Sequence, residues 1–254
     1  MKKWLLSFWV FALVFVTIVI LTSSKKQVNK IAMPNPQAVV VMELFTSQGC
    51  SSCPPADRLL GKYAAGNDER IIPLSFHVDY WNRLGWTDSF SSKKFTERQN
   101  MYAQMLKLES IYTPQLIING QKEMVGNDER AVANAVSNAL KDPAQISVSL
   151  SASQIKGNSA AVSYTLSMVP FNASVNAVLL QKEATTHIRA GENRGVKLTN
   201  YNVVRDFTTD KVAALSGSTS LHIPAGYNSS AFMIVVFVQD NNSGKISGAS
   251  KINL

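Results

Sequence analysis

The sequence of 254 residues contains only two cysteines and three histidines. Two cysteines cannot form the set of disulfides that replaces a hydrophobic core in small secreted scaffolds, and 46% hydrophobic residues suffice for packed cores. A structural zinc site needs four ligands. Beyond the cysteines, the only soft candidates are His77, His187 and His222. Structural zinc is therefore disfavoured.

The sequence also lacks a nucleic-acid motif and a basic patch with interleaved aromatic residues, although its formal net charge is +8. Five of the 25 basic residues come before Glu43, the first acidic residue, and they are Lys2, Lys3, Lys25, Lys26 and Lys30. The rest of the chain carries 20 basic and 17 acidic residues, a net charge of +3. Because this balance is ordinary, we expect no nucleic-acid partner.

Only one apolar run is long enough to cross a membrane, and it lies at the amino terminus. Trp4 to Leu21 is almost wholly apolar and has lysines on both sides. A signal-peptide core has roughly 7–15 residues and a spanning helix roughly 17–25, so residues 1–24 are either a signal peptide or a membrane anchor. Residues 25–37 are polar, contain two prolines and read as a linker. In both cases we expect the remainder in a periplasm-like or extracellular space.

The cysteines follow a predicted strand. In Val39 to Asp57, an apolar β-branched run is followed by a glycine-containing turn and then by Cys50 and Cys53. This order predicts strand, turn and helix, with Cys50 at the helix start, where free backbone N–H groups and the helix dipole stabilise a thiolate. Two prolines follow at once, as the first helical turn allows. A disulfide across so short a loop stabilises a fold little, so stability is a poor reason for the pair.

Residues 38–142 read as alternating strands and helices. After the helix that follows the cysteines, we expect a strand buried on both faces over Ile71–Tyr80 and an amphipathic helix over Thr96–Leu108. Asn119-Gly120 predicts a hairpin turn, and a last helix is expected over Glu129–Leu140. The predicted order is β-α-β-α-β-β-α.

From Gln145 onward, segments with period-two hydrophobicity alternate with turns rich in Gly, Asn and Ser. About seven strands over roughly 110 residues are typical of a sandwich. The predicted fold is therefore an α/β domain over residues 38–142, followed by an all-β sandwich-like domain over residues 143–254, with a hydrophobic helix at the amino terminus.

Two resemblances follow from these motifs. The strand, the C-x-x-C pair at a helix start, the later Thr-Pro before a strand, the hairpin and the closing helix resemble the thioredoxin superfamily over residues 38–141. More closely, the segments ELFTSQGCSSCPPAD, FHVDYWNRLGW, TPQLIING and GENRGVKLTNYNVVRDF are similar to an exported bacterial family known only as a domain of unknown function, DUF1223. The resemblance implies a thioredoxin-like fold with an appended carboxy-terminal domain, and it does not give a reaction.

The thioredoxin pattern implies roles for four residues. Cys50 would be the attacking thiol and Cys53 the resolving thiol. Pro114, preceded by Thr113, would be the cis-proline whose neighbouring backbone guides the disulfide of a partner. The intervening Ser51-Ser52 departs from the Gly-Pro of thioredoxin itself, so the redox direction stays open.

The superfamily also places a buried acid on the first strand, six residues before the nucleophile. Here Glu43 lies seven residues before Cys50. Glu43 is therefore either the proton acceptor for Cys53 or a solvated or capping residue.

Three functions are compatible with the sequence. The first is an exported thiol–disulfide oxidoreductase without a cofactor, acting on protein or small-molecule thiols and disulfides. The second is a copper-binding or copper-delivery module with Cys50, Cys53 and His77 as ligands. It resembles a thioredoxin-fold copper-chaperone family but departs from its spacer length and histidine position. The third is a non-catalytic binding protein with a structural disulfide. The sequence does not decide whether the protein is an enzyme.

Two further segments bear on binding. A substrate groove beside Cys50 is one interpretation of the residues after the second strand, and plain packing or a structural histidine is the other; the residues are His77, Asp79, Tyr80, Trp81 and Trp86. The segment GENRGVKLTNYNVVRD is too polar for a strand interior. It is either a loop that docks on the cysteine site or a solvated loop, and its polar residues are Glu192, Asn193, Arg194, Asn200, Asn202 and Arg205.

Overall fold

The computed structural model describes residues 36–254. The predicted hydrophobic helix over Trp4 to Leu21 lies outside these residues. Among the residues that are described, no helix combines the length and the apolar character that a membrane crossing requires.

The first half of the described chain has the predicted order of strands and helices. Its elements are β1 (Val40–Thr46), α2 (Pro54–Ala64), β2 (Ile71–His77), the short 3₁₀ helix η1 (Asn82–Leu84), α3 (Lys93–Met105), β3 (Gln115–Ile118), β4 (Lys122–Val125) and α4 (Glu129–Ala139). The predicted hairpin is confirmed, because β3 and β4 pair antiparallel around Asn119-Gly120. Asp128 caps α4 by accepting a hydrogen bond from the Ala131 N–H.

The second half consists of strands, as predicted. They are β5 (Val148–Lys156), β6 (Ser159–Leu166), β7 (Ala173–His187), β8 (Lys197–Lys211), β9 (Ser216–His222), β10 (Phe232–Asp240) and β11 (Ile246–Asn253), with the 3₁₀ helix η2 (Ser229–Ala231) before β10.

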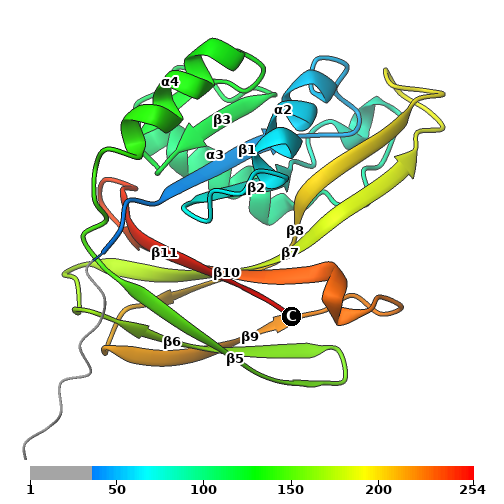
Figure 1. Ribbon diagram of the computed structural model, residues 1–254. Coiled ribbons are helices and arrows are strands. Elements are labelled where there is room, and N and C mark those ends of the chain that lie inside the picture. The colour runs from blue at the N-terminus through cyan, green and yellow to red at the C-terminus, as the bar shows by residue number, and fades with distance from the viewer. Residues whose placement is uncertain (1–35) are drawn as a thin grey trace, which may run out of the picture. The chain divides into compact units, whose positions relative to one another are not determined.

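The predicted fold class is nevertheless wrong. One mixed sheet of eight strands, in the order β11-β10-β7-β8-β2-β1-β3-β4, takes its strands from both halves of the chain, and β5, β6 and β9 form a second sheet. The two halves join where β8 pairs parallel with β2, at Ser75 and Val203 (Figure 1). The structure is mainly β-sheet and is not an α/β thioredoxin-like domain followed by a separate sandwich. Hydrophobic periodicity predicts that a segment is a strand, but it does not predict which strand will cover its edge.

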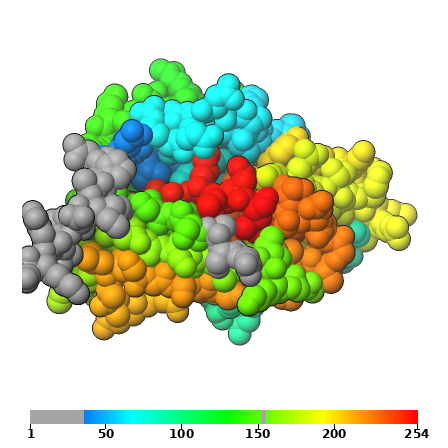
Figure 2. Space-filling view, turned by 60° about the horizontal axis from the view of Figure 1, so that its bottom comes forward, coloured from blue at the N-terminus to red at the C-terminus, as the bar shows by residue number. Residues whose placement is uncertain are grey.

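The side chains of β1 alternate between two cores. Val40, Met42 and Leu44 pack with α2 and α4, whereas Val41 and Phe45 pack on the opposite face of the sheet with α3. The three-stranded sheet covers the face of β7 and β10 that α3 leaves free. In Figure 2, β11 (red) lies between segments of the first half (cyan) and β10 (orange).

The β7–β8 hairpin is long and runs past α2 (Figure 1). Its close approach to the helix requires Gly61, because a Cβ atom there would lie 2.4 Å from the ring of Tyr201. The hairpin ends in residues 188–196, called here the tip loop. In the space-filling view the hairpin residues, in yellow, stand out at one side of the visible face (Figure 2). The fold thus brings the tip loop from the second half to the cysteine segment of the first.

Candidate functional site

Cys50 and Cys53 form a disulfide just before α2. The helix begins at Pro54 with Cys53 as its N-cap, and Cys50 lies in the preceding turn, where its carbonyl accepts a hydrogen bond from the Cys53 N–H at 3.2 Å. The expectation that Cys50 opens the helix is therefore wrong. Pro54 and Pro55 lack the N–H groups that would face a thiolate. The start of this helix therefore stabilises a cysteine thiolate less strongly than the sequence suggested.

Both cysteines are fully buried. The Cys50 Sγ lies 3.3 Å from the Ser52 hydroxyl oxygen and 3.9 Å from the Thr113 carbonyl oxygen. The Thr113–Pro114 peptide bond is cis, as predicted. The structure thus brings together Cys50, Cys53, Thr113 and Pro114, which the sequence analysis had selected from two distant segments.

The tip loop docks on the cysteine turn. The side-chain amide of Asn193 donates to the carbonyl oxygens of Gln48 (2.9 Å) and Cys50 (3.0 Å), and Asn193 itself is buried. The carboxylate of Glu192 accepts a hydrogen bond from the Ser51 N–H at 3.0 Å. The docked loop is confirmed for Glu192 and Asn193, but the expectation that the whole segment is too polar for a strand is wrong, because β8 begins at Lys197 and contains Asn200, Asn202 and Arg205.

The other polar residues of that segment lie elsewhere. Asn200 is buried, and Asn202 donates to the Pro73 carbonyl oxygen at 3.0 Å, which ties β8 to β2. Arg205 donates to the Gln181 side chain, and Arg194 is exposed.

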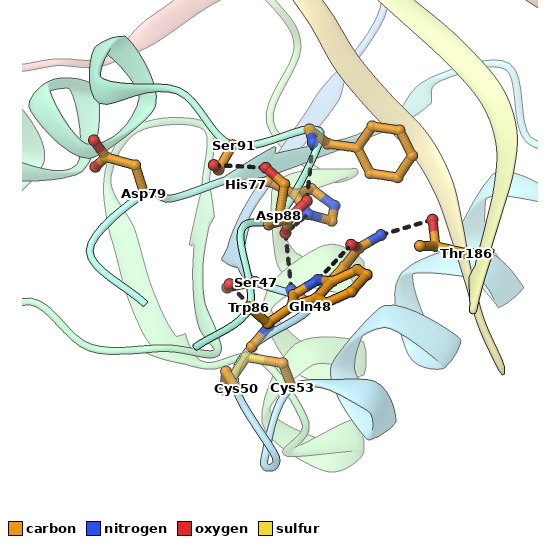
Figure 3. Close-up of polar contacts among 12 residues, drawn as sticks. Ser47, Gln48, Cys50, Cys53, His77, Asp79, Trp86, Asp88, Ser91 and Thr186 are labelled. Atoms are coloured by element: carbon orange, nitrogen blue, oxygen red, sulfur yellow. Dashed lines mark hydrogen bonds and ion pairs between the residues drawn. A yellow bond between two sulfur atoms is a disulfide. The ribbon is translucent and has the colours of Figure 1, made fainter. Parts of the chain in front are cut away.

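A buried network connects the cysteine turn to β2 (Figure 3). The Asp88 carboxylate accepts from the Gln48 N–H at 2.8 Å and lies 2.6 Å from His77 Nδ1. The Gln48 side chain accepts from the Trp86 indole N–H at 3.1 Å and donates to the Thr186 hydroxyl at 3.0 Å. Sequence reasoning did not single out Asp88, Gln48 or Thr186, because they come from three separate segments.

His77 and Asp88 are both fully enclosed. Burial opposes a charged imidazole, but the Asp88 carboxylate outweighs it and raises the pKa of His77. Burial likewise opposes the charge on Asp88, but the imidazole and the N–H groups of Gln48 and Phe90 lower its pKa. Both shifts favour the charged forms of the pair. Because His77 is fully enclosed, it does not reach a substrate at the surface.

Asp57 is buried on α2, four residues after Cys53. Its Oδ1 has no hydrogen-bond partner among the described side chains, and the same holds for five buried side-chain atoms on β1, β2 and β8: Thr46 Oγ1, Ser75 Oγ, His77 Nε2, and Asn200 Oδ1 and Nδ2. Burial raises the pKa of Asp57 to about 6, although the charge of His77 and the side chains of Thr46 and Asn200 oppose the shift. We call Thr46, Asp57, His77, Asp88 and Asn200 the Asp57 cluster.

Glu43 lies on the opposite face of β1, because it alternates with Met42 and Leu44. Its carboxylate accepts from Arg98 Nε at 2.5 Å and Nη2 at 2.9 Å, and also from the Tyr102 hydroxyl. Gln239 completes the set by accepting from Arg98 at 3.1 Å and donating to Tyr102 at 2.8 Å. These four residues form the Glu43 cluster. The structure therefore does not bring the predicted proton acceptor to Cys53.

The four other residues predicted to line a groove separate into two groups. Trp81 lies beside the site, where its indole N–H donates to the Thr113 hydroxyl at 2.8 Å, and Trp86 contacts Gln48 as described. Asp79 instead accepts from the Thr96 hydroxyl at 2.6 Å, and Figure 3 shows it apart from the disulfide. Tyr80 is directed toward Gln99, with its hydroxyl 3.3 Å from Oε1.

Within the described part of the chain, no group of three or more His, Cys, Asp or Glu side chains is arranged to hold a metal ion. The sulfur atoms of Cys50 and Cys53 are joined to each other. Both would have to be reduced before they could act as copper ligands beside His77.

Comparisons with known proteins extend over most of the chain. The family described as "Protein of unknown function (DUF1223)" matches residues 41–239. A crystal structure of a protein from Agrobacterium tumefaciens is 31% identical, covers 85% of this chain and 95% of its own, and superposes with a TM-score of 0.65. No curated protein matches the chain.

A second solved structure is more distant. It is a domain of the outer membrane lipoprotein Omp28 from Porphyromonas gingivalis, which is 14% identical and covers 44% of this chain and 96% of its own. Its TM-score of 0.28 is too low to carry an argument. The comparisons agree with the family that the sequence motifs predicted, and they leave the thioredoxin resemblance unconfirmed.

Proposed function

The chain belongs to the DUF1223 family, and from this premise we propose that it is a thiol–disulfide oxidoreductase acting on protein or small-molecule thiols and disulfides outside the cytoplasm. One observation carries the proposal: the Cys50–Cys53 disulfide lies at the N-cap of α2, and its Cys50 sulfur contacts Ser52 and the backbone of Thr113.

The reaction is an exchange of disulfides. In the oxidising direction, a thiolate of the substrate attacks Cys50 Sγ, a mixed disulfide forms, and Cys53 leaves as a thiolate that takes up a proton. A second substrate thiolate then releases Cys50, so the substrate gains a disulfide and the cysteine pair gains two electrons and two protons. The reverse sequence reduces a substrate disulfide.

Two features support a reactive role for the pair. A bridge that closes a loop of four residues stabilises a fold by only about 2 kcal/mol in the chain-entropy estimate, compared with about 4.7 kcal/mol for a loop of 100 residues. The Ser52 hydroxyl, 3.3 Å from Cys50 Sγ, can donate a hydrogen bond to a thiolate at that position.

The tip loop controls access to the pair in this proposal. Because both cysteines are fully buried, a partner reaches Cys50 only after neighbouring groups move. The contacts of Asn193 and Glu192 with the cysteine turn are local hydrogen bonds that a partner can replace. The same burial favours the second candidate, a binding protein whose disulfide is inert.

Copper binding by Cys50, Cys53 and His77 is the third candidate. The arrangement of His77 favours it, because histidine ligands commonly donate their other ring N–H to a carboxylate, as His77 can to Asp88. The cysteine pair would have to be reduced first.

A redox titration separates the three candidates. The full chain, purified in a mild detergent, is equilibrated with a series of glutathione ratios, and the free thiols are counted by alkylation and mass spectrometry while copper binding is measured in parallel. A reversible two-electron transition between roughly −180 and −270 mV supports the oxidoreductase. A disulfide that resists reduction below about −300 mV, with no copper bound, leaves the inert bridge.

Trapping variants identify the attacking sulfur. Cys53→Ala is expected to accumulate a mixed disulfide at Cys50, whereas Cys50→Ala is not. Stoichiometric Cu(I) binding that is lost in His77→Ala would favour the copper module instead.

Export is proposed from the sequence alone. The apolar run Trp4 to Leu21 has the features of a signal peptide or anchor. Cell fractionation of the full chain tests it, with recovery in the cytoplasm as the contrary result.

A further inference from the structure

We propose that Asp57 is the buried proton acceptor for Cys53, and that His77 and Asp88 hold its carboxylate in the charge state for that role. The inference rests on the oxidoreductase function proposed above and adds a mechanism to it. It begins from the unpartnered polar atoms of the Asp57 cluster, which the structural role of α2 does not explain.

The position of Asp57 follows from the helix. Cys53 has right-handed helical dihedral angles (φ −78°, ψ −35°), and the Asp57 N–H donates to the Cys53 carbonyl at 3.1 Å. Side chains four residues apart in this conformation lie on the same side of a helix. Asp57 is thus the carboxyl group one helical turn from the Cys53 sulfur.

The surroundings of Asp57 leave it free to take up a proton. Buried polar atoms almost always have hydrogen-bond partners, yet Asp57 Oδ1 and His77 Nε2 have none among the described residues. Thr46 and Asn200 lie close enough to Asp57 for their side chains to lower its pKa, although neither makes a hydrogen bond with regular geometry. Such a group of donors and acceptors can stabilise either protonation state of the carboxyl group.

Charged groups on several elements around Asp57 act on its pKa. His77 on β2 lowers its pKa and Asp88 after β2 raises it, while burial has the largest effect and raises it to about 6. Arg205 on β8 acts on the cluster through His77. With Asp88 already paired, Asp57 is the carboxyl group of this cluster that changes charge near neutral pH.

The other two carboxylates near the cysteine segment do not suit the role. Glu43 is on the opposite face of β1 and is held by Arg98 and Tyr102. Glu192 is exposed, and its hydrogen bonds to Ser51 lower its pKa. A lowered pKa makes a carboxylate a weaker proton acceptor.

The proposed step is the closure of the Cys50–Cys53 disulfide, which releases the substrate. A substrate disulfide of the form R–S–S–R has exchanged with Cys50, which now carries one half of it as a mixed disulfide. The Cys53 thiol gives its proton to the Asp57 carboxylate, directly or through one bound water. The Cys53 thiolate then attacks Cys50 Sγ, the bond between Cys50 and the substrate sulfur breaks, and the substrate leaves as a thiolate that takes a proton from solvent.

Acid-quenched reactions measure the closure of the Cys50–Cys53 disulfide separately from the formation of the mixed disulfide. The reduced full chain, in detergent, is mixed with glutathione disulfide between pH 5 and pH 8 and quenched with acid. Mass spectrometry then follows the reduced protein, the glutathione mixed disulfide and the closed disulfide. The rate of mixed-disulfide formation reports on Cys50, and the rate of its disappearance reports on Cys53.

We expect Asp57→Asn to slow closure at pH 7 by about 10²-fold, the lower range for loss of a general base, while formation changes less than about twofold. Wild-type closure should slow as the pH falls through about 6, and Asp57→Asn should lack this inflection. Glu97→Gln is the control, since it removes an exposed carboxylate from α3, which packs on the opposite face of the sheet, and it should leave closure unchanged.

A second variant keeps the test decisive if Asp57→Asn does not fold. His77→Gln removes the positive charge that lowers the pKa of Asp57, so the inflection should move to higher pH. An unchanged closure rate in Asp57→Asn, or an inflection that stays in place in His77→Gln, overturns the inference alone. A wild-type protein that forms no mixed disulfide at all overturns the proposed function, and the inference with it.

Discussion

The Glu43 cluster and the Asp57 cluster are two buried polar groups on opposite faces of one sheet, and they differ in how completely they are satisfied. Glu43 is bound by Arg98 and Tyr102, and the Arg98 guanidinium also stacks against aromatic rings, with Phe207 at 4.9 Å. Five buried atoms of the Asp57 cluster lack a partner within residues 36–254.

The difference separates a group that holds the fold from the group to which we assign proton transfer. A saturated charge pair fixes the packing of α3 on the sheet. An unsaturated buried cluster is destabilising by itself, which is tolerated where proton transfer needs it.

Removing one partner of the Glu43 cluster should have the largest effect. Arg98→Met leaves the Glu43 carboxylate buried without its counter-charge, and we expect a loss of about 3–5 kcal/mol in the free energy of unfolding. Urea unfolding followed by tryptophan fluorescence measures it. The matched control is the double variant Glu43→Leu with Arg98→Met, which removes both charges and should recover most of the loss. A single variant that costs less than about 1 kcal/mol would contradict the structural role.

Neutralising Asp57 should raise the free energy of unfolding, whereas removing Arg98 lowers it. The pKa of Asp57 is raised from 3.8 to about 6, so the folded protein binds a proton more tightly than the unfolded chain. The free energy of unfolding should therefore fall as the pH rises from about 4 to 6, with a total of about 3 kcal/mol. Asp57→Asn should remove this fall and be more stable than the wild type at pH 7.

The neighbours of Asp57 act in other pH ranges. The raised pKa of His77 gives stability that is present below about pH 6.5 and is lost as the pH rises through its folded value. The lowered pKa of Asp88 gives stability that is lost as the pH falls below about 4. Urea unfolding at several pH values, with the exposed Glu97→Gln as control, measures the slope. Equal slopes in wild type and Asp57→Asn would contradict the assignment.

The sequence could predict features that depend on neighbouring residues, but not the two buried clusters, whose residues come from distant segments. Local patterns located Cys50 and Cys53 and the turn at Asn119-Gly120, because each depends on residues close in the chain. The docked tip loop was one of two readings, and the contacts of Asn193 and Glu192 separate them. Such contacts join residues more than 140 positions apart.

The misses have the same origin. Glu43 was chosen for its distance from Cys50 in the sequence, although strand alternation turns it away from α2. Sequence reasoning did not single out Asp57, and an acid in the first helical turn is favourable to the helix dipole without any further role. Its burial depends on β8, whose place beside β2 no local pattern predicts.

Loosening the tip loop should have an intermediate effect, and it should be seen in the rate at which the Cys50–Cys53 disulfide is reduced. Asn193→Ala removes two hydrogen bonds to the cysteine turn, each worth about 0.5–1.5 kcal/mol. Reduction of the disulfide by dithiothreitol should therefore become about 5- to 100-fold faster. Alkylation after acid quenching measures the rate. Arg194→Ala, an exposed neighbour in the same loop, should leave it unchanged. Equal rates in Asn193→Ala and wild type would show that the loop does not limit access.

The smallest effect is expected where a charge pair is exposed. Lys62 and Glu129 join α2 to α4 with an N–O distance of 2.6 Å, similar to that between Arg98 and Glu43, but their side chains are 68% and 66% exposed. Solvent screens such a pair, so Lys62→Ala should change the free energy of unfolding by at most about 1 kcal/mol, and less at high salt. Urea unfolding at two salt concentrations measures it, with Arg98→Met alongside. If both variants lost the same stability, the strength of each ion pair would depend on its N–O distance and not on its burial. The Glu43 cluster would then not differ from an exposed pair.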